Sequence, residues 1–199
     1  MKSTDLMIPS WFSKMESLPE DPENSVVYGY GMGNADCFAI VYPLPAEQSM
    51  TLDGKERMIN GLRQCLQDNQ GLIEVEEGKT ALGQLYLYTI VKTLKNPGVQ
   101  YVMTMHLAYP ENTIHVQGVF NEEGTTGMRD AVVYAMLSNE GKVKITDVGI
   151  ESWSQDPYDP AYKKGVCMNC SEQAAYDELF PQHPLSEARR FAAELIRLN

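Results

Sequence analysis

The sequence predicts an α+β fold, in which one twisted antiparallel β-sheet has helices packed on it and a C-terminal helical extension follows. Three observations support this fold. Segments rich in β-branched and aromatic residues alternate with Gly, Pro and Asn turn residues, which is typical of antiparallel strands. Two other segments carry apolar residues at the spacing of an amphipathic helix. From residue 152 onward the composition changes to prolines and aspartates, and then to helix-forming residues.

The expected strands fall into a hairpin and a meander. A Gly-Asn turn joins the two strands of the hairpin, and an Asn-Pro-Gly turn interrupts the meander. The predicted strands are residues 25–31, 36–44, 72–78, 81–94, 99–109, 113–120 and, last and shortest, 142–148.

The first predicted helix covers residues 51–71. Asp53 and Glu56 have the spacing of a capping box, and Gly71 stands where a C-cap glycine is expected. The apolar residues of this segment form one stripe, which we expect to face the sheet. They are Met58, Ile59, Leu62, Cys65 and Leu66.

A second helix is predicted at 124–141, beginning at Thr126 and ending near Gly141. Its apolar residues also form one stripe, which indicates a packed face. They are Met128, Ala131, Val132, Ala135 and Leu137.

The change of composition divides the chain into an α+β domain of residues 1–150 and a connector with a helical tail at 151–199. Residues 152–165 are typical of an exposed connector. Pro181 and Pro184 separate two short helical patterns, 171–180 and 184–199. The last has an apolar side made of Leu185, Ala188, Ala192, Leu195 and Ile196.

Charge and composition exclude several classes of partner. The net charge is −11 and the pI is near 4.7, so the surface repels phosphate backbones and anionic lipids, and we expect no nucleic-acid or membrane partner. The N-terminal residues contain no apolar stretch of signal-peptide length, and no segment is apolar enough to span a bilayer, which predicts a cytoplasmic protein. Four cysteines do not make a disulfide framework in such a protein.

Two of the three histidines, His106 and His115, lie in the predicted strands 99–109 and 113–120. With Glu111 and Asn112 as a two-residue loop, alternation places both on the face opposite the methionines and aliphatic residues. This register pairs His106 with Gln117 and Ala108 with His115. We interpret the histidines as polar residues on a solvated sheet face, because Gln and Thr neighbours are poor zinc ligands. A metal site, a ligand site or a pH-sensitive patch is the alternative.

Cys167 and Cys170 form a Cys-x-x-Cys motif, the spacing of zinc knuckles and of thiol redox centres. A zinc knuckle requires a second pair, and the remaining Cys37 and Cys65 lie in a predicted strand and a predicted helix stripe. We therefore interpret the motif as two linker thiols, with metal or redox use as the alternative.

No other motif indicates catalysis. The glycines of residues 29–35 precede a strand and lack the spacing of a phosphate-binding loop. The acidic pairs Glu76-Glu77 and Glu122-Glu123 stand at strand ends and are interpreted as solvated edges. No catalytic residue, cofactor site or metal site is assigned.

The order strand, strand, helix, four-stranded meander, helix resembles the PsbP and small Ran-binding Mog proteins over residues 5–140. Met7, Pro9, Trp11 and Phe12 resemble the entry segment of those domains. The resemblance implies a twisted antiparallel sheet between helices and a binding or accessory role without a shared catalytic centre. It transfers no functional residue, and the tail after residue 150 departs from the pattern.

These observations predict a non-enzymatic protein-binding or accessory module whose partner is another protein. Aromatic residues near the amphipathic tail are the candidate anchors for that partner, or for docking of the tail on its own domain. They are Trp153, Tyr158, Tyr162, Tyr176 and Phe180. The alternative is a small metal- or thiol-dependent enzyme or redox protein that uses Cys167 with Cys170, or His106 with His115.

Overall fold

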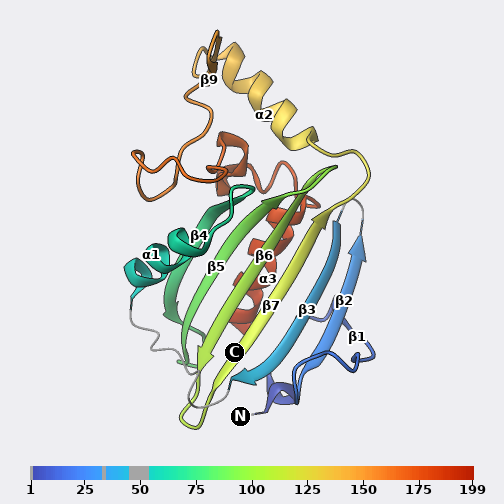
Figure 1. Cartoon of the computed structure of the whole chain (residues 1–199). Coiled ribbons are helices and arrows are strands. Elements are labelled where there is room, and N and C mark those ends of the chain that lie inside the picture. The colour runs from blue at the N-terminus through green and yellow to red at the C-terminus, as the bar shows by residue number, and fades with distance from the viewer. Residues whose placement is uncertain (1, 33–34, 45–53) are drawn as a thin grey trace.

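The computed structural model describes residues 2–32, 35–44 and 54–199. In these ranges the chain forms a seven-stranded antiparallel sheet in the order β1-β2-β3-β7-β6-β5-β4 and a separate hairpin of β8 and β9 (Figure 1). The strands are β1 (Ser13–Lys14), β2 (Val26–Met32), β3 (Ala35–Leu44), β4 (Gln70–Lys79), β5 (Leu85–Leu94), β6 (Val99–Ala108), β7 (Thr113–Glu122), β8 (Lys144–Thr146) and β9 (Gly149–Glu151). The helices are α1 (Lys55–Cys65), α2 (Met128–Asn139) and α3 (Pro184–Leu198), with the 3-10 turns η1 (Ser3–Asp5), η3 (Cys170–Glu172) and η4 (Ala174–Tyr176). The predicted α+β class is confirmed.

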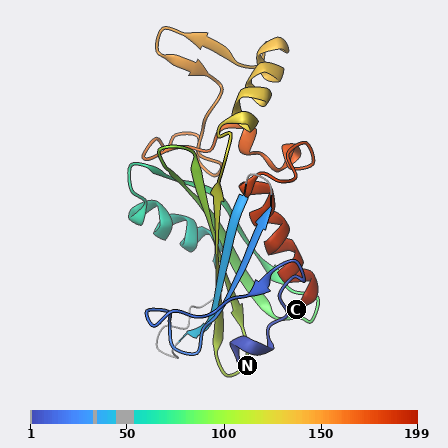
Figure 2. The same ribbon diagram turned by 90° about the vertical axis from the view of Figure 1, so that its right-hand side faces the viewer.

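The two faces of the sheet carry different helices (Figure 2). Helix α3 lies across β6 and β7 on one face, while α1 covers β4 on the other. The apolar side of α3 is buried in the main core together with the inward-facing residues of β3, β5, β6 and β7. Phe191 at its centre contacts Phe12 and Phe120, with ring centroids 4.6 and 5.9 Å away. The C-terminal tail thus docks on the sheet of its own chain. The predicted division of the chain into two domains at residue 150 stays a prediction.

Helix α1 is shorter than predicted. It ends at Cys65, and its expected C-cap, Gly71, lies inside β4. Glycine is required at position 71 because the tail approaches closely: a Cβ there would be 1.7 Å from the carbonyl oxygen of Val166. Cys65 is exposed, whereas the rest of the predicted stripe packs on β4, and Asp53 of the expected capping box lies outside the described residues.

The predicted register of β6 and β7 is wrong by two residues. The amide of Tyr109 donates to the carbonyl of Asn112 at 2.9 Å, so the turn takes in Pro110, and Ala108 pairs with Thr113. Proline lacks the N–H that a place in the ladder would require, which favours the longer turn. A shift of two residues preserves the faces. The inward set was predicted correctly, and His106 now pairs directly with His115.

Helix α2 and the β8–β9 hairpin project beyond the end of the sheet (Figures 1 and 2). The predicted stripe of α2 is wrong except for Leu137, which does face inward. Val133 and Leu137 pack with Val143, Trp153 and the aromatic residues of the tail, while Met128, Ala131, Val132 and Ala135 are exposed. Arg129 occupies the remaining inward position, so a charged residue stands where periodicity favours an apolar one.

If α3 completes the core, Phe191→Ala leaves a cavity and lowers the free energy of unfolding by about 3–5 kcal/mol, measured by urea denaturation. Phe38→Ala is the matched control, because Phe38 lies on the other face and is 38% exposed. It should cost about 1 kcal/mol or less. Equal losses in the two variants would contradict the assigned packing.

Candidate functional site

A buried group of charged residues lies where the upper ends of β5 and β6 meet η3 and the first turns of α2 and α3. We call it the polar cluster; its members are Glu74, Lys92, Arg129, Asp130, Ser171, Glu172, Asp177 and Arg189. Lys92 projects from β5 toward the α3 face, and its Nζ lies 2.6 Å from Oε2 of Glu172. The hydroxyl of Tyr101, opposite Lys92 on β6, donates to Oε1 of Glu172 at 3.0 Å.

Arg129 lies at the centre of the polar cluster's contacts with the tail and is only 1% exposed. Its Nε donates to the carbonyl of Ser171 at 2.7 Å, and Nη1 donates to Oγ of Ser186 at 2.9 Å. Its Nη2 donates to the carbonyl of Gln173 at 3.1 Å and to Asp177 at 3.0 Å. Four of the five guanidinium N–H groups therefore have protein acceptors.

The remaining members extend the polar cluster to both sides. Arg189 of α3 donates to Asp177 at 3.1 Å and to Glu74 of β4 at 2.6 Å. Asp130 accepts hydrogen bonds from the hydroxyl of Ser171 and from the side-chain amide of Asn169. Three cations thus face four carboxylates, which leaves the polar cluster with one excess negative charge.

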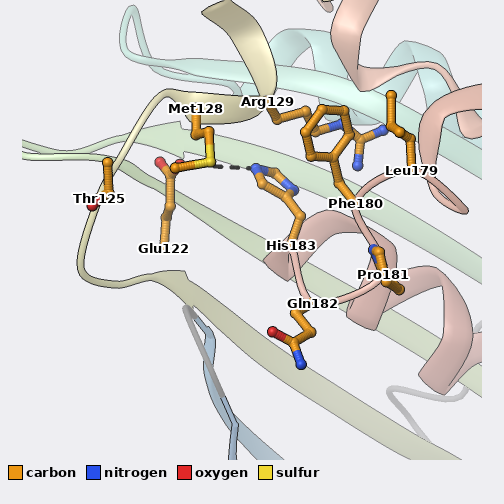
Figure 3. Close-up of a pocket in the computed structure, with 9 residues that line it drawn as sticks. All are labelled: Glu122, Thr125, Met128, Arg129, Leu179, Phe180, Pro181, Gln182 and His183. Atoms are coloured by element: carbon orange, nitrogen blue, oxygen red, sulfur yellow. Dashed lines mark ion pairs between the residues drawn. The ribbon is translucent and has the colours of Figure 1, made fainter. Parts of the chain in front are cut away.

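A cavity of about 220 Å³ opens beside Arg129 (Figure 3). Its walls come from the end of β7, the start of α2 and the segment that leads into α3. They are Glu122, Thr125, Met128, Arg129, Leu179, Phe180, Pro181, Gln182 and His183. Apolar side chains thus surround two ionisable groups that lie close together, Glu122 and His183.

His183 is held neutral by its surroundings. Burial, together with the charges of Arg129 and Arg189, lowers the pKa of His183 to about 3. Its Nδ1 accepts the amide of Leu185 at 3.2 Å and caps α3, so the proton resides on Nε2. That nitrogen lies 3.9 Å from Oε1 of Glu122 (Figure 3).

Glu122 is a buried carboxylate whose side chain is 5% exposed. It accepts the amide of Gly127 at 2.8 Å and that of Val99 at 3.2 Å. Burial raises the pKa of Glu122, and these two hydrogen bonds oppose the shift. The interpretation of Glu122 as a solvated edge is therefore wrong, because the turn into α2 covers it.

The cavity is better suited to binding than to catalysis. The ring nitrogen of His183 that could act as a base is committed to the N-cap of α3. Thr125 supplies the hydroxyl of the lining, and no hydrogen bond joins it to His183 or Glu122 within the described chain. In the described ranges, no three His, Cys, Asp or Glu residues gather in a way that could hold a metal ion.

His106 and His115 do not lie on a wet surface; they are 7% and 9% exposed, so that interpretation is wrong. The two histidines are cross-strand neighbours on β6 and β7. Leu87 of β5 lies beside His106, and Tyr42 of β3 lies beside His115. Nδ1 of His115 lies 3.1 Å from Nε2 of His106. Burial lowers the pKa of both, that of His106 to about 4. The pairing of β7 with β3, which supplies Tyr42 as a neighbour, could not be read from the meander alone.

The two thiols of the Cys-x-x-Cys motif contact backbone carbonyls. Cys167 lies 3.8 Å from the carbonyl of Tyr162, and Cys170 lies 3.3 Å from that of Ser152. Burial raises the pKa of the Cys170 thiol, whereas redox-active thiols need a lowered pKa. Cys170 opens only the three-residue turn η3, not a helix.

The five aromatic residues predicted as partner anchors are all partly buried against their own chain. Trp153, Tyr176 and Phe180 pack beneath α2. The hydroxyl of Tyr158 bonds both backbone groups of Val75 in β4, at 2.6 and 3.2 Å, and that of Tyr162 bonds the carbonyl of Arg63 in α1 at 3.2 Å. Their role toward a partner stays a prediction.

Sequence reasoning missed Arg129, Glu122 and His183. Two signals were present. Arg129, Val133 and Leu137 share one helix face at i, i+4 and i+8, and His183 stands directly before a proline that suits the first position of a helix. Glu122 had no such signal, because its burial depends on where α2 lies.

The fold defines an α+β protein built on one antiparallel sheet. No protein-family model matches the chain, and no curated protein matches it. Several solved structures are similar to the chain. One is PA94 of Pseudomonas aeruginosa, a protein of unknown function, with a TM-score of 0.40 and 5% sequence identity; the match covers 68% of this chain and 96% of that chain. Another is the Ran-binding protein Mog1p of Saccharomyces cerevisiae, with a TM-score of 0.36 and 13% identity; the match covers 67% of this chain and 75% of that chain.

The described residues contain no helix with the length and apolar character needed to cross a membrane.

His183 makes stability depend on pH. The pKa of His183 is about 3 in the folded chain and about 6.5 in the unfolded chain. Below pH 6.5 the unfolded chain therefore binds a proton that the folded chain does not bind, and the free energy of unfolding falls. Between pH 7 and pH 5 the wild type should lose roughly 2 kcal/mol of unfolding free energy more than His183→Gln, by urea denaturation at both pH values. Parallel losses would show that His183 is not held neutral.

Arg129 should be essential for stability because its loss leaves the carbonyls of Ser171 and Gln173 without this donor and removes one of the two cations that face Asp177. We expect Arg129→Met to lower the free energy of unfolding by about 3–5 kcal/mol. Arg197→Met is the control, since the Arg197 side chain is 66% exposed in its pair with Glu194. That variant should change stability by less than about 1 kcal/mol. The assignment fails if the two variants unfold at the same urea concentration.

Proposed function

We propose that this chain is a non-enzymatic protein-binding or accessory module, and that its binding surface is the outer face of α2. One observation carries the proposal: α2 is apolar on both sides. Its inward side packs on the tail, and the outward side presents Met128, Val132 and Met136, which are 50, 40 and 40% exposed. These residues recur at i, i+4 and i+8 and form one line along the helix.

Neighbouring residues enlarge the exposed apolar surface. Leu179 is 54% exposed and lines the same cavity as Met128. The β8–β9 hairpin, which also projects beyond the sheet, exposes Ile145, Ile150 and Val148, the last at 98%. Exposed apolar residues gathered in this way are typical of surfaces that bind another protein. Methionine suits such a surface because its unbranched side chain adapts to a partner.

Charge favours a basic partner. Residues 121–151, which include α2 and the hairpin, carry six acidic and three basic side chains, a net charge of −3. A partner with apolar residues flanked by Lys or Arg would complement this surface in both respects. The absence of a nucleic-acid or membrane partner belongs to the same proposal, because the chain as a whole is acidic. The cytoplasmic location stays a prediction.

The alternative, a metal- or thiol-dependent enzyme, has less support. The thiols of Cys167 and Cys170 contact backbone carbonyls, and Cys170 opens a three-residue turn in place of a helix. An activated thiol needs a nearby cation or a helix N-terminus. His106 and His115 have Leu87 and Tyr42 as their cross-strand neighbours, so these neighbours supply no further ligand.

The α2 surface is tested with Met136→Glu, which places a charge in the exposed stripe. Proteins captured from cell extract by the wild type are purified and titrated by calorimetry against each variant. We expect Met136→Glu to weaken binding at least tenfold, because interface centres tolerate truncation and charge poorly. Leu82→Glu is the control, since Leu82 is 65% exposed in the turn between β4 and β5, at the other end of the sheet.

The control should bind within twofold of the wild type, and both variants should keep the wild-type melting temperature. The proposal is wrong if no purified protein binds, or if the purified partner binds the two variants equally well.

A further inference from the structure

Glu122 is a buried carboxylate without a cation. In the described part of the chain, no Lys or Arg forms an ion pair with it, and its nearest ionisable neighbour, His183, is neutral. Two backbone amides are its only hydrogen-bond donors there. A buried charge that lacks an opposite charge is costly, and a cation in the cavity would offset that cost.

The surrounding charges also favour a cation over an anion. The polar cluster already has one excess negative charge, and Glu122 makes it two. Arg129, the one cation in the described cavity wall, is paired with Asp177, and only one of its five N–H groups remains without an acceptor. An anion would therefore meet the Glu122 carboxylate, and Arg129 would offer it a single remaining N–H donor.

The shape of the cavity indicates a cation on an aliphatic stem. Its volume of about 220 Å³ is several times the roughly 30 Å³ that one water occupies in the liquid. Met128, Leu179, Phe180 and Pro181 supply apolar walls, and Glu122 lies across the cavity from Leu179 and Pro181 (Figure 3). Lysine and arginine combine such a stem with a charged end.

We propose that this cavity binds a lysine or arginine side chain of the partner protein, with its charged group at Glu122 and its stem between Met128 and Leu179. The proposal rests on the proposed function, because Met128 and Leu179 also belong to the exposed apolar surface of α2. The partner would thus lay apolar residues along Val132 and Met136 and insert one basic side chain beside the first turn of α2.

The test uses small probes, so it does not require the partner. N-acetyl-lysine methylamide and N-acetyl-arginine methylamide are titrated into the full chain labelled with ¹³C at the methionine methyl groups. Because Met128 lines the cavity, we expect a saturable shift of its methyl signal with at least one probe. Glu122→Gln keeps the shape and the acceptor oxygen but removes the charge, and it should weaken that binding at least tenfold.

Two controls distinguish binding that depends on charge from nonspecific hydrophobic binding. Glu123→Gln makes the same change at an exposed neighbour and should leave the affinity within twofold. N-acetyl-norleucine methylamide has an apolar side chain without the ammonium group and should bind at least tenfold more weakly than the lysine probe. The cation site is refuted by an absent or non-saturable Met128 shift, by equal binding of norleucine, or by equal binding to Glu122→Gln.

The outcomes also separate this proposal from the proposed function. Met136 does not line the cavity, so Met136→Glu should still bind the probe although it loses the partner. If the probes fail on the wild type while Met136→Glu still abolishes partner binding, the cation site is refuted and the α2 surface stands. If the probes bind and Met136→Glu keeps the partner, the α2 surface is refuted instead.

Discussion

The guanidinium group of Arg129 fixes the upper part of the molecule. From the first turn of α2 it reaches η3, the segment that follows η3 and the first turn of α3, so one side chain joins elements that are far apart in the sequence. The position of α2 in turn decides that Glu122 is covered and that Met128, Val132 and Met136 face outward. Both the apolar surface and the cavity therefore depend on the four hydrogen bonds that hold this buried charge in place.

Much of the sheet could be predicted from the sequence because its strands bury alternate residues, and alternation is visible locally. Alternation assigned the methionines of strand 99–109 to the face opposite the histidines, and Met103 and Met105 are buried in the core. The amphipathic side of α3 was equally clear. The direction of α2 was not, because this helix is apolar on two sides and the inward one contains Arg129. A periodicity argument selects the side with more apolar residues, and here that side faces solvent.

The candidate site was harder to predict because its residues come from β7, α2 and the segment before α3, and each looks ordinary alone. Glu122 follows a strand, as solvated carboxylates often do, and His183 stands in a proline-rich turn. Their burial results from long-range packing. His106 and His115 show the converse: the local pattern gave the correct face, but the neighbours that bury them, Leu87 and Tyr42, come from strands whose partners only the fold reveals.

The contact between the tail and β4 has a consequence for solubility. Strand β4 ends the sheet, and an open strand at that position invites addition of a foreign strand. Here the Val166 amide donates to the Gln70 carbonyl at 2.9 Å, and Tyr158 occupies the backbone groups of Val75. At the opposite margin, β1 is only two residues long. Tyr158 and Val166 thus cover backbone groups that β4 would otherwise offer to a foreign strand, and Gly71 leaves room for the close approach of Val166.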